Sequence, residues 1–317
     1  MMLFMLRRLA ALIITLLVAS LMIFLLLEIL PGDPAVVILG VGAQDDTLQA
    51  LRNELGLNHP ASVRYFNWII QVFQGNLGRS YTYDRPVQEL LLNRVELSLP
   101  LALLAIILST GIAIPLGVLA ASRHRKVSDT SIMGFAQLGV AIPNFWFAIL
   151  LILLFSVKLG WFSAGGFAGW DAGLLPAFKS LVLPAVALAF PKAAILARVT
   201  RSSVLETVQE DYIRTARAKG LSKNQTLWRH ALPNALIPVV TILGLQLSFL
   251  LAGTIIIENV FYLPGVGRLL FQAIAQRDLM VVKNLILLFA ASVVVINFLV
   301  DVLYAVLDPR LRMSSHE

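Results

Sequence analysis

The sequence predicts an all-α membrane protein with six transmembrane helices, and composition and apolar segment length are the observations behind this. Hydrophobic residues make up 58% of the 317 positions and charged residues only 14%, too little polar surface for an ordinary water-soluble domain. A transmembrane helix takes about 20 apolar residues. Six segments are long enough, at approximately 9–30, 96–120, 132–157, 181–197, 236–257 and 285–307. The fourth is the shortest, and Pro184 and Pro191 interrupt it.

The distribution of basic residues predicts how the chain is oriented. Short segments on the N-terminal side carry Arg and Lys at positions 7–8, 123–126, 198–229 and 310–312. The opposite short loops hold only Lys158, Lys179, Arg268, Arg277 and Lys283. The positive-inside rule therefore places both termini and the loop 198–235 in the cytoplasm. Because topology accounts for the net charge of +7, no nucleic-acid partner is expected.

The organisation along the chain predicts two parts. Residues 1–94 would hold the N-terminal transmembrane helix and a long, ordered extracytoplasmic insert, and residues 95–317 a five-helix core. Within the insert, Thr47–Leu55 and Pro60–Gln74 predict short helices that end at Gly56 and Gly75. Two interpretations of the insert stay open: a lid on the membrane surface, or a platform that shapes the outer mouth or receives a partner.

The polar loop between the fourth and fifth segments, at about 198–235, predicts a helix–glycine–helix hook. Two patterns have capping-box spacing, at 203–206 and at 222–225, so each predicts a helix start. The first helix would end at Gly220, where a left-handed residue closes the last turn. The second, at about 223–231, would stop before Pro233, because proline disfavours helical geometry in its predecessor. Such a hook is suited to docking with a partner.

Residues for catalysis or cofactor binding are not visible in the sequence. The four histidines are scattered, cysteine is absent, and neither His-Glu-x-x-His nor Gly-x-Ser-x-Gly occurs. No glycine-rich phosphate loop with a following Lys-Ser/Thr is present either. We therefore expect a chain that is not an enzyme and binds no metal, ATP or other cofactor itself.

Polar residues near the apolar segments give candidates for a translocation path. Charged residues inside a membrane are costly, so Glu258, near the end of the fifth segment, has either an interfacial or a path-lining role. Pro143-Asn144-Phe145-Trp146 predicts either an interfacial anchor or a kink that shapes a pore. The candidate path residues are Pro143, Asn144, Glu258 and Asn259.

The hook resembles the cytoplasmic loop of a known family, the membrane-spanning subunits of bacterial ABC importers. Members carry Glu-Ala-Ala, three residues, Gly, nine residues and then Ile-x-Leu-Pro. In this chain Ala216, Gly220 and 232–233 match, whereas 214–215 and His230 depart. The sequence Arg-Thr-Ala-Arg-Ala-Lys-Gly is similar to the form found in the dipeptide, oligopeptide and nickel branch, and in particular to dipeptide permease B-type chains. Further motifs of that branch follow in order: 31–34, 75–80, 142–146, 258–261, 264–265, 277–278 and 301–310.

The resemblance implies a permease in the bacterial inner membrane with alternating access driven by partner ATPases. Its partners would be a second homologous permease subunit, two cytoplasmic ABC ATPases that bind ATP and Mg, an extracytoplasmic solute-binding protein, and membrane lipid. The cargo would be short peptides, with nickel chelates, glutathione or oligosaccharides as alternatives. An ion-coupled carrier or an intramembrane enzyme is the rival class, and neither explains the hook. The ATPase-docking residues would be Tyr212, Arg214, Thr215, Ala216, Arg217, Gly220, Leu227, Trp228, Leu232 and Pro233.

Overall fold

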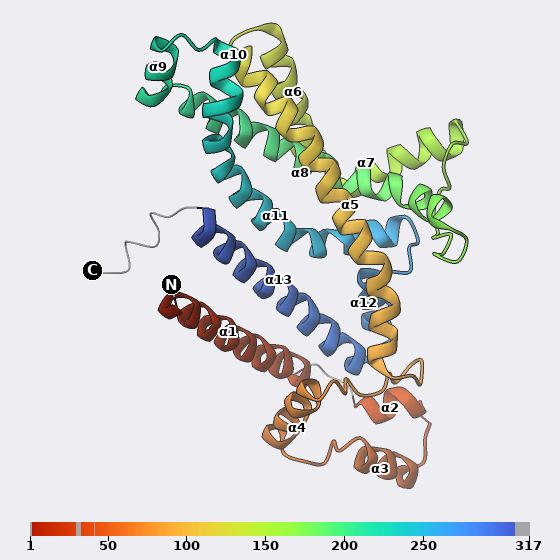
Figure 1. The fold of residues 1–317 in the computed structure, drawn as a ribbon. Helices are drawn as coiled ribbons and strands as arrows, with labels where there is room; N and C mark the ends of the chain where they lie inside the picture. Colours follow the sequence, from red (N-terminus) through yellow and green to blue (C-terminus); the bar gives the residue numbers. More distant parts are fainter. Residues whose placement is uncertain (1, 30–32, 41, 308–317) are drawn as a thin grey trace. The chain divides into compact units, whose positions relative to one another are not determined.

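The computed structural model describes residues 2–29, 33–40 and 42–307, and this part of the chain is almost entirely helical (Figure 1). Five of the described helices are long and apolar enough to cross a membrane, or six if one bent pair counts as a single span. The C-terminal arginines Arg310 and Arg312, and residues 31–32 of the family motif at 31–34, lie outside the described residues. Two compact units divide the chain: residues 1–98 with 264–298, and residues 99–263 with 299–317. The predicted boundary at residue 94 remains a prediction.

Unit 1 is built on the first apolar helix and the insert that follows it. Its elements are α1 (Met2–Ile29), α2 (Pro34–Leu39), α3 (Asp45–Glu54), α4 (Ala61–Phe73), the beginning of α5 (Val87–Ser122), α12 (Val266–Ala275) and most of α13 (Leu279–Leu307). Trp68 of α4 is buried in an apolar cluster with Ile23 and Phe24 of α1. The two helices predicted in the insert are confirmed, and Gly56 and Gly75 follow them with positive φ of 67° and 76°.

Unit 2 is organised around α8 (Leu174–Thr207), which packs against α6 (Val127–Ala141), α7 (Asn144–Leu151) and α11 (Leu232–Val260). Small residues let the helices approach closely. A Cβ at Gly117 of α5 would lie 2.6 Å from the Cβ of Thr200, and one at Gly139 of α6 would lie 2.8 Å from the Cβ of Ala194. Close approach through small residues is how helices associate within a membrane.

The fourth apolar segment is longer than the sequence predicts. The prediction ended it at 197 and treated Pro184 and Pro191 as interruptions, but both prolines lie inside one continuous helix, α8. Apolar helices packed among neighbours tolerate proline, because neighbouring groups and small backbone adjustments satisfy the freed carbonyls. Most of the apolar part of α8 is buried, which supplies that support.

The third segment is a bent pair rather than one straight helix. The chain leaves α6 at Ala141 and enters α7, followed by the π-helical η1 (Ile152–Lys158), with a change of direction of 104°. Ile142 is extended, with φ −82° and ψ 124°, because Pro143 disfavours helical geometry in the residue before it. Pro143 therefore marks a bend in the chain.

Candidate partner-docking site

The first arm of the hook is α9 (Asp211–Ala218). The predicted start at Ser203 is wrong, because Ser203 and Glu206 lie inside α8 and the helix continues to Thr207. Ser203 and Val204 are buried, so packing of this face extends α8 past the capping pattern. A short turn at 208–210 separates the end of α8 from the start of α9.

The corner at Gly220 is confirmed. Gly220 has φ +91°, a backbone conformation that residues with a Cβ rarely adopt. Its N–H donates to the Arg217 carbonyl at 2.9 Å, and the Leu221 N–H donates to the Ala216 carbonyl at 3.4 Å. No atom lies within 4 Å of where a Cβ at Gly220 would stand, so the backbone conformation alone restricts this position.

The second arm begins as predicted but does not end as predicted. Ser222 and Gln225 form a capping box: the Gln225 N–H donates to Ser222 Oγ at 3.2 Å, and the Ser222 N–H donates to Gln225 Oε1 at 3.1 Å. Instead of stopping before Pro233, α10 (Lys223–Thr226) continues through the π-helical η2 (Leu227–Ala231) into α11. Pro233 lies in the first turn of α11, directly after the π-helical turn η2.

The predicted docking residues divide into an outward and an inward group. Ile213, which is 0% exposed, and Ala216 form the buried side of α9. Leu227 packs against a buried cluster that includes Val204 and Leu232. The exposed members are Tyr212, Arg214, Thr215, Arg217, Gly220, Trp228 and Pro233. Ala216, Leu227 and Leu232 thus support the hook from inside, while the others present its surface; docking itself stays a prediction.

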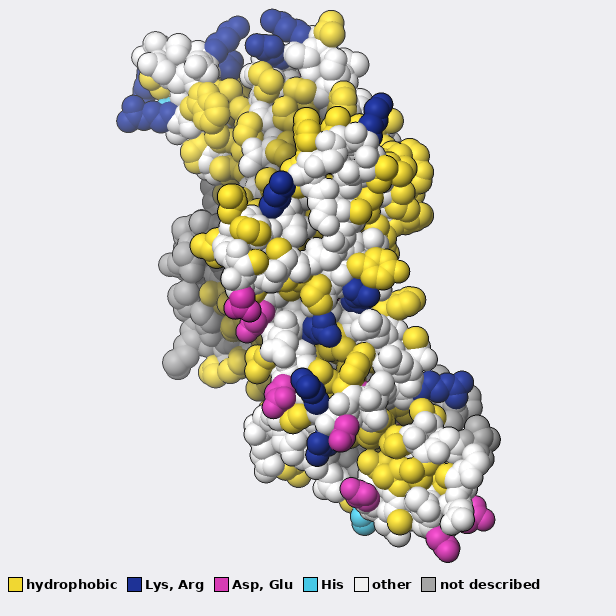
Figure 2. All heavy atoms as spheres, turned by 90° about the vertical axis from the view of Figure 1, so that its right-hand side faces the viewer, with side chains coloured by type: hydrophobic (Ala, Val, Ile, Leu, Met, Phe, Trp, Pro, Cys, Tyr) yellow, Lys and Arg dark blue, Asp and Glu magenta, His cyan; other side chains and the backbone are white. Residues whose placement is uncertain are grey.

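The hook end of unit 2 is strongly basic. Figure 2 shows Lys and Arg side chains gathered at the end that carries α9 and α10. The turn between α5 and α6, at 123–126, lies at the same end in Figure 1 and contributes exposed Arg123, Arg125 and Lys126. Such a surface agrees with the cytoplasmic orientation that the positive-inside rule predicts.

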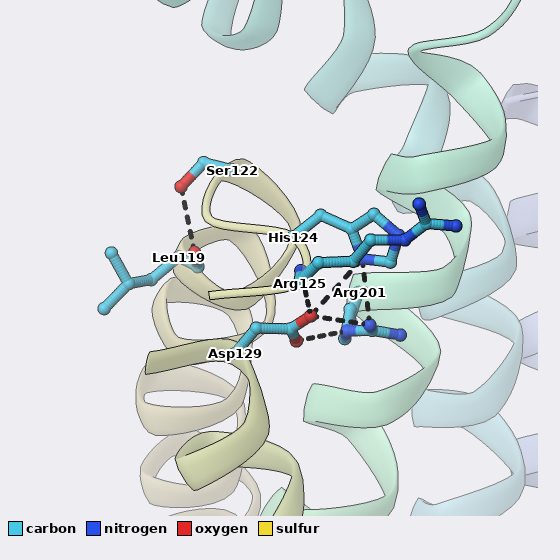
Figure 3. A network of polar contacts seen from close by, with 6 residues as sticks. All are labelled: Leu119, Ser122, His124, Arg125, Asp129 and Arg201. Atoms are coloured by element: carbon cyan, nitrogen blue, oxygen red, sulfur yellow. Dashed lines mark hydrogen bonds and ion pairs between the residues drawn. The ribbon is translucent and has the colours of Figure 1, made fainter. Parts of the chain in front are cut away.

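An ion pair between a buried carboxylate and a partly buried guanidinium, which the sequence patterns did not predict, joins α6 to the last turns of α8 (Figure 3). Arg201 of α8 donates from Nε to Asp129 Oδ1 at 2.6 Å and from Nη2 to Asp129 Oδ2 at 2.8 Å. Asp129 is only 4% exposed and also accepts the Arg125 N–H at 3.0 Å. His124 Nδ1 lies 3.1 Å from Arg201 Nη2 and 3.3 Å from Asp129 Oδ2. In the sequence, Asp129 follows the basic residues at 123–126, but this local pattern does not identify Arg201, 72 positions away, as its partner.

Three of the four candidate path residues come from two helices that pack together, α7 and α11, and Pro143 immediately precedes α7. Pro143 is exposed at the bend and Asn144 begins α7. Glu258 is buried near the end of α11, and Asn259 Nδ2 donates to the Ile255 carbonyl at 2.7 Å. Their place in a translocation path stays a prediction.

The long apolar helices and the basic hook define a membrane-spanning transport subunit. The chain belongs to the binding-protein-dependent transport system inner membrane component family, which matches residues 113–313, and the N-terminal family of the same systems matches residues 1–102. A protein of Brucella abortus (strain 2308), named as a peptide transport system permease, is 44% identical over 97% of this chain and 98% of its own. The glutathione transport system permease protein GsiC of Salmonella typhimurium is 39% identical over 98% of both chains.

Solved structures show the same fold. A chain of the MetNI methionine ABC transporter, solved in an inward-facing conformation, superposes with a TM-score of 0.58 at 21% identity, covering 69% of this chain and 96% of that chain. Family membership makes this protein the membrane subunit of an ABC importer, which works with permease and ATPase subunits. ATP hydrolysis lies in the ATPase subunits, and this chain is not itself an enzyme.

Proposed function

We propose that this chain forms part of the translocation pathway for short peptides, with alternating access driven by its partner ATPases. The observation that carries the cargo proposal is near-full-length identity of 39–44% to chains named as peptide and glutathione permeases. Glutathione is a tripeptide, so both names fall in one chemical class. Nickel chelates and oligosaccharides remain alternatives that no feature of the described residues favours.

The proposed topology has six spans, with α6, α7 and η1 together forming the third. Both termini and the hook face the cytoplasm, and the insert that follows α1 lies outside the cytoplasm. The concentration of exposed Arg and Lys at the hook end supports this orientation. The chain is therefore surrounded by membrane lipid in the bacterial inner membrane.

The proposed assembly pairs this permease with a second, homologous permease, with two ATPases beneath them and a solute-binding protein outside. ATP and Mg bind to the ATPases, and this chain contributes no cofactor ligand. The insert at 31–94 either shapes the outer mouth or receives the binding protein. Residues Pro143, Asn144, Glu258 and Asn259 would contribute to the path.

The hook gives this assembly a mechanical connection. Its exposed Tyr212, Arg217 and Trp228 suit a groove on an ATPase, because an amphipathic helix laid into a groove is a recurrent docking mode. The first arm joins α8 through a short turn, and the second arm is continuous with α11. Closure of the ATPases would thus displace both α8 and α11, which is a rigid-body route to alternating access.

Purification of the tagged chain from its native cell in mild detergent tests the proposal. We expect mass spectrometry to find a second permease and one or two P-loop ATPases. Membrane vesicles should then take up labelled dipeptides or glutathione only with ATP and the binding protein encoded with them. A chain recovered alone that still catalyses uptake contradicts the importer. Uptake restricted to nickel chelates or oligosaccharides contradicts the peptide cargo.

A further inference from the structure

The pair Asp129–Arg201 joins three segments at one buried carboxylate. Asp129 lies in the first turn of α6, and its Oδ2 accepts the backbone N–H of Arg125 in the preceding turn. Arg125 has φ +63°, an uncommon conformation that this contact helps to hold. Arg201 lies near the end of α8, the helix that leads into the hook. The α5–α6 turn, the start of α6 and the end of α8 are thus fixed to one another.

The pair is positioned where hook movement enters the helices. Arg201 precedes the end of α8 at Thr207 by less than two helical turns, and α9 starts at Asp211 after a short turn. At its other end, α6 reaches the extended Ile142 and the 104° bend before α7. The pair therefore links the helix that leads into the hook with the first turn of α6, the helix that runs to the bend.

Other contacts also join α6 to α8, but they lie further from the start of α6 than Asp129 does. Deeper along the helices, Gly139 packs on Ala194, and Arg198 Nη2 donates to Gln137 Oε1 at 3.0 Å at an exposed position. An apolar cluster including Val118 and Val204 holds α5, rather than α6, to the end of α8. Among the described residues, the polar contact that joins the first turn of α6 to α8 is made by the Asp129 carboxylate.

Stability alone is a poor explanation for such a pair. Taking the Asp129 carboxylate out of water has a desolvation cost that the pairing must offset, and well-packed apolar residues often stabilise a protein equally well. What a two-pronged Arg–carboxylate contact adds is a fixed geometry. A fixed geometry suits the transmission of a helix displacement better than it suits a purely stabilising role.

We infer that Asp129 and Arg201 form a positioning pair that transmits displacement of the hook from α8 to α6, and so to the bend at Pro143. This inference rests on the proposed docking of the hook on an ATPase. His124 contacts both members and completes the cluster from the α5–α6 turn. Loss of the pair would leave an assembled complex in which ATP is hydrolysed with less transport.

The test uses the complete importer reconstituted in lipid vesicles, with peptide transported per ATP hydrolysed as the readout. We expect Asp129→Asn and Arg201→Gln each to lower this ratio by at least about fivefold, the lower end of typical coupling effects between sites. The double variant should be no worse than the poorer single variant, because both remove the same contact. Ser122→Ala is the matched control: the exposed Ser122 Oγ donates to the Leu119 carbonyl of its own helix at 2.9 Å, so this contact joins no two segments.

Assembly is checked by co-purification of the ATPases with each variant. An unchanged ratio in assembled Asp129→Asn and Arg201→Gln overturns the inference. If neither variant assembles, Arg201→Lys decides, since it keeps the charge but cannot make the two-pronged contact. A reduced ratio there supports the inference, and a wild-type ratio overturns it. Absence of ATPase partners or of peptide uptake in the wild type would instead refute the proposed function.

Discussion

Asn234 Nδ2 donates a hydrogen bond of 2.9 Å to the Tyr212 hydroxyl, and this bond joins α9 directly to the first turn of α11. Asn234 Nδ2 also donates to the His230 carbonyl at 3.1 Å, so the amide is held in place by its own helix. The hook is therefore closed by a side-chain bridge as well as by the corner at Gly220. In the proposed mechanism, a displacement of α9 would reach α11 through both.

Replacement of Tyr212 by Phe tests this bridge. The bond lies at the surface, so its removal should change the free energy of unfolding by only about 1 kcal/mol. If the bridge carries displacement, transport per ATP should nevertheless fall about two- to fivefold. Both are measurable on the reconstituted complex. A variant with wild-type transport per ATP would show that the bridge has no part in coupling.

Replacement of Gly220 by Val tests the corner. A β-branched residue resists φ +91°, at a cost of about 1–3 kcal/mol, so the corner should open and ATP hydrolysis should become uncoupled from uptake. Membrane insertion should be intact, because the position is exposed and no neighbouring atom is displaced. Gly220→Asn is the matched control, since Asn adopts positive φ more readily. Normal uptake by Gly220→Val would count against the corner as described.

Replacement of Ser222 by Ala tests the second helix start. Loss of the capping hydroxyl costs about 1 kcal/mol and frees the Gln225 N–H. Because α10 is only four residues long before η2, we expect faster hydrogen exchange over 223–226 and little change deeper in α11. Ser222→Asp should restore slow exchange because Asp also caps helices. Equal exchange in Ser222→Ala and wild type would argue that the cap is dispensable.

Replacement of Trp68 by Phe tests unit 1 independently of the hook. Trp68 Nε1 donates to the buried Asn284 Oδ1 at 3.2 Å, while Asn284 Nδ2 donates to the Leu77 and Met280 carbonyls. The variant leaves the buried Asn284 Oδ1 without its donor. The free energy of unfolding, measured by thermal unfolding in detergent, should therefore fall by about 1–3 kcal/mol. Trp161→Phe, at an exposed position, should change the free energy of unfolding by no more than about 0.5 kcal/mol. Equal losses of stability in both variants would contradict a stabilising role for the Trp68–Asn284 hydrogen bond.

Local patterns predicted the parts of the hook and insert that local chemistry determines. The positive φ at position 220 favours glycine whatever the neighbours are, and Ser222 and Gln225 form a capping box within four residues. Ser203 and Glu206 show the same spacing, yet burial against neighbouring helices keeps them inside α8. The sequence window contains no information about that burial.

The remaining differences also come from packing between distant segments. Pro191 stays within α8 because tertiary contacts support the helix, and Pro233 is accommodated by the π-helical turn before it. By contrast, Pro143 breaks the chain into α6 and α7. The pairing of Asp129 with Arg201 depends on how α6 packs on α8, which neither residue's neighbours indicate.

Site-specific cross-linking is the most direct test of docking through the hook. The chain contains no cysteine, so single cysteines at Arg217 and Trp228 can each carry a photoreactive group without further changes. A cysteine at Arg79, an exposed position in unit 1, is the control. In the intact complex we expect both hook positions to cross-link to the ATPase subunits and position 79 not to. Intact complexes in which neither hook position reaches an ATPase would contradict the central claim.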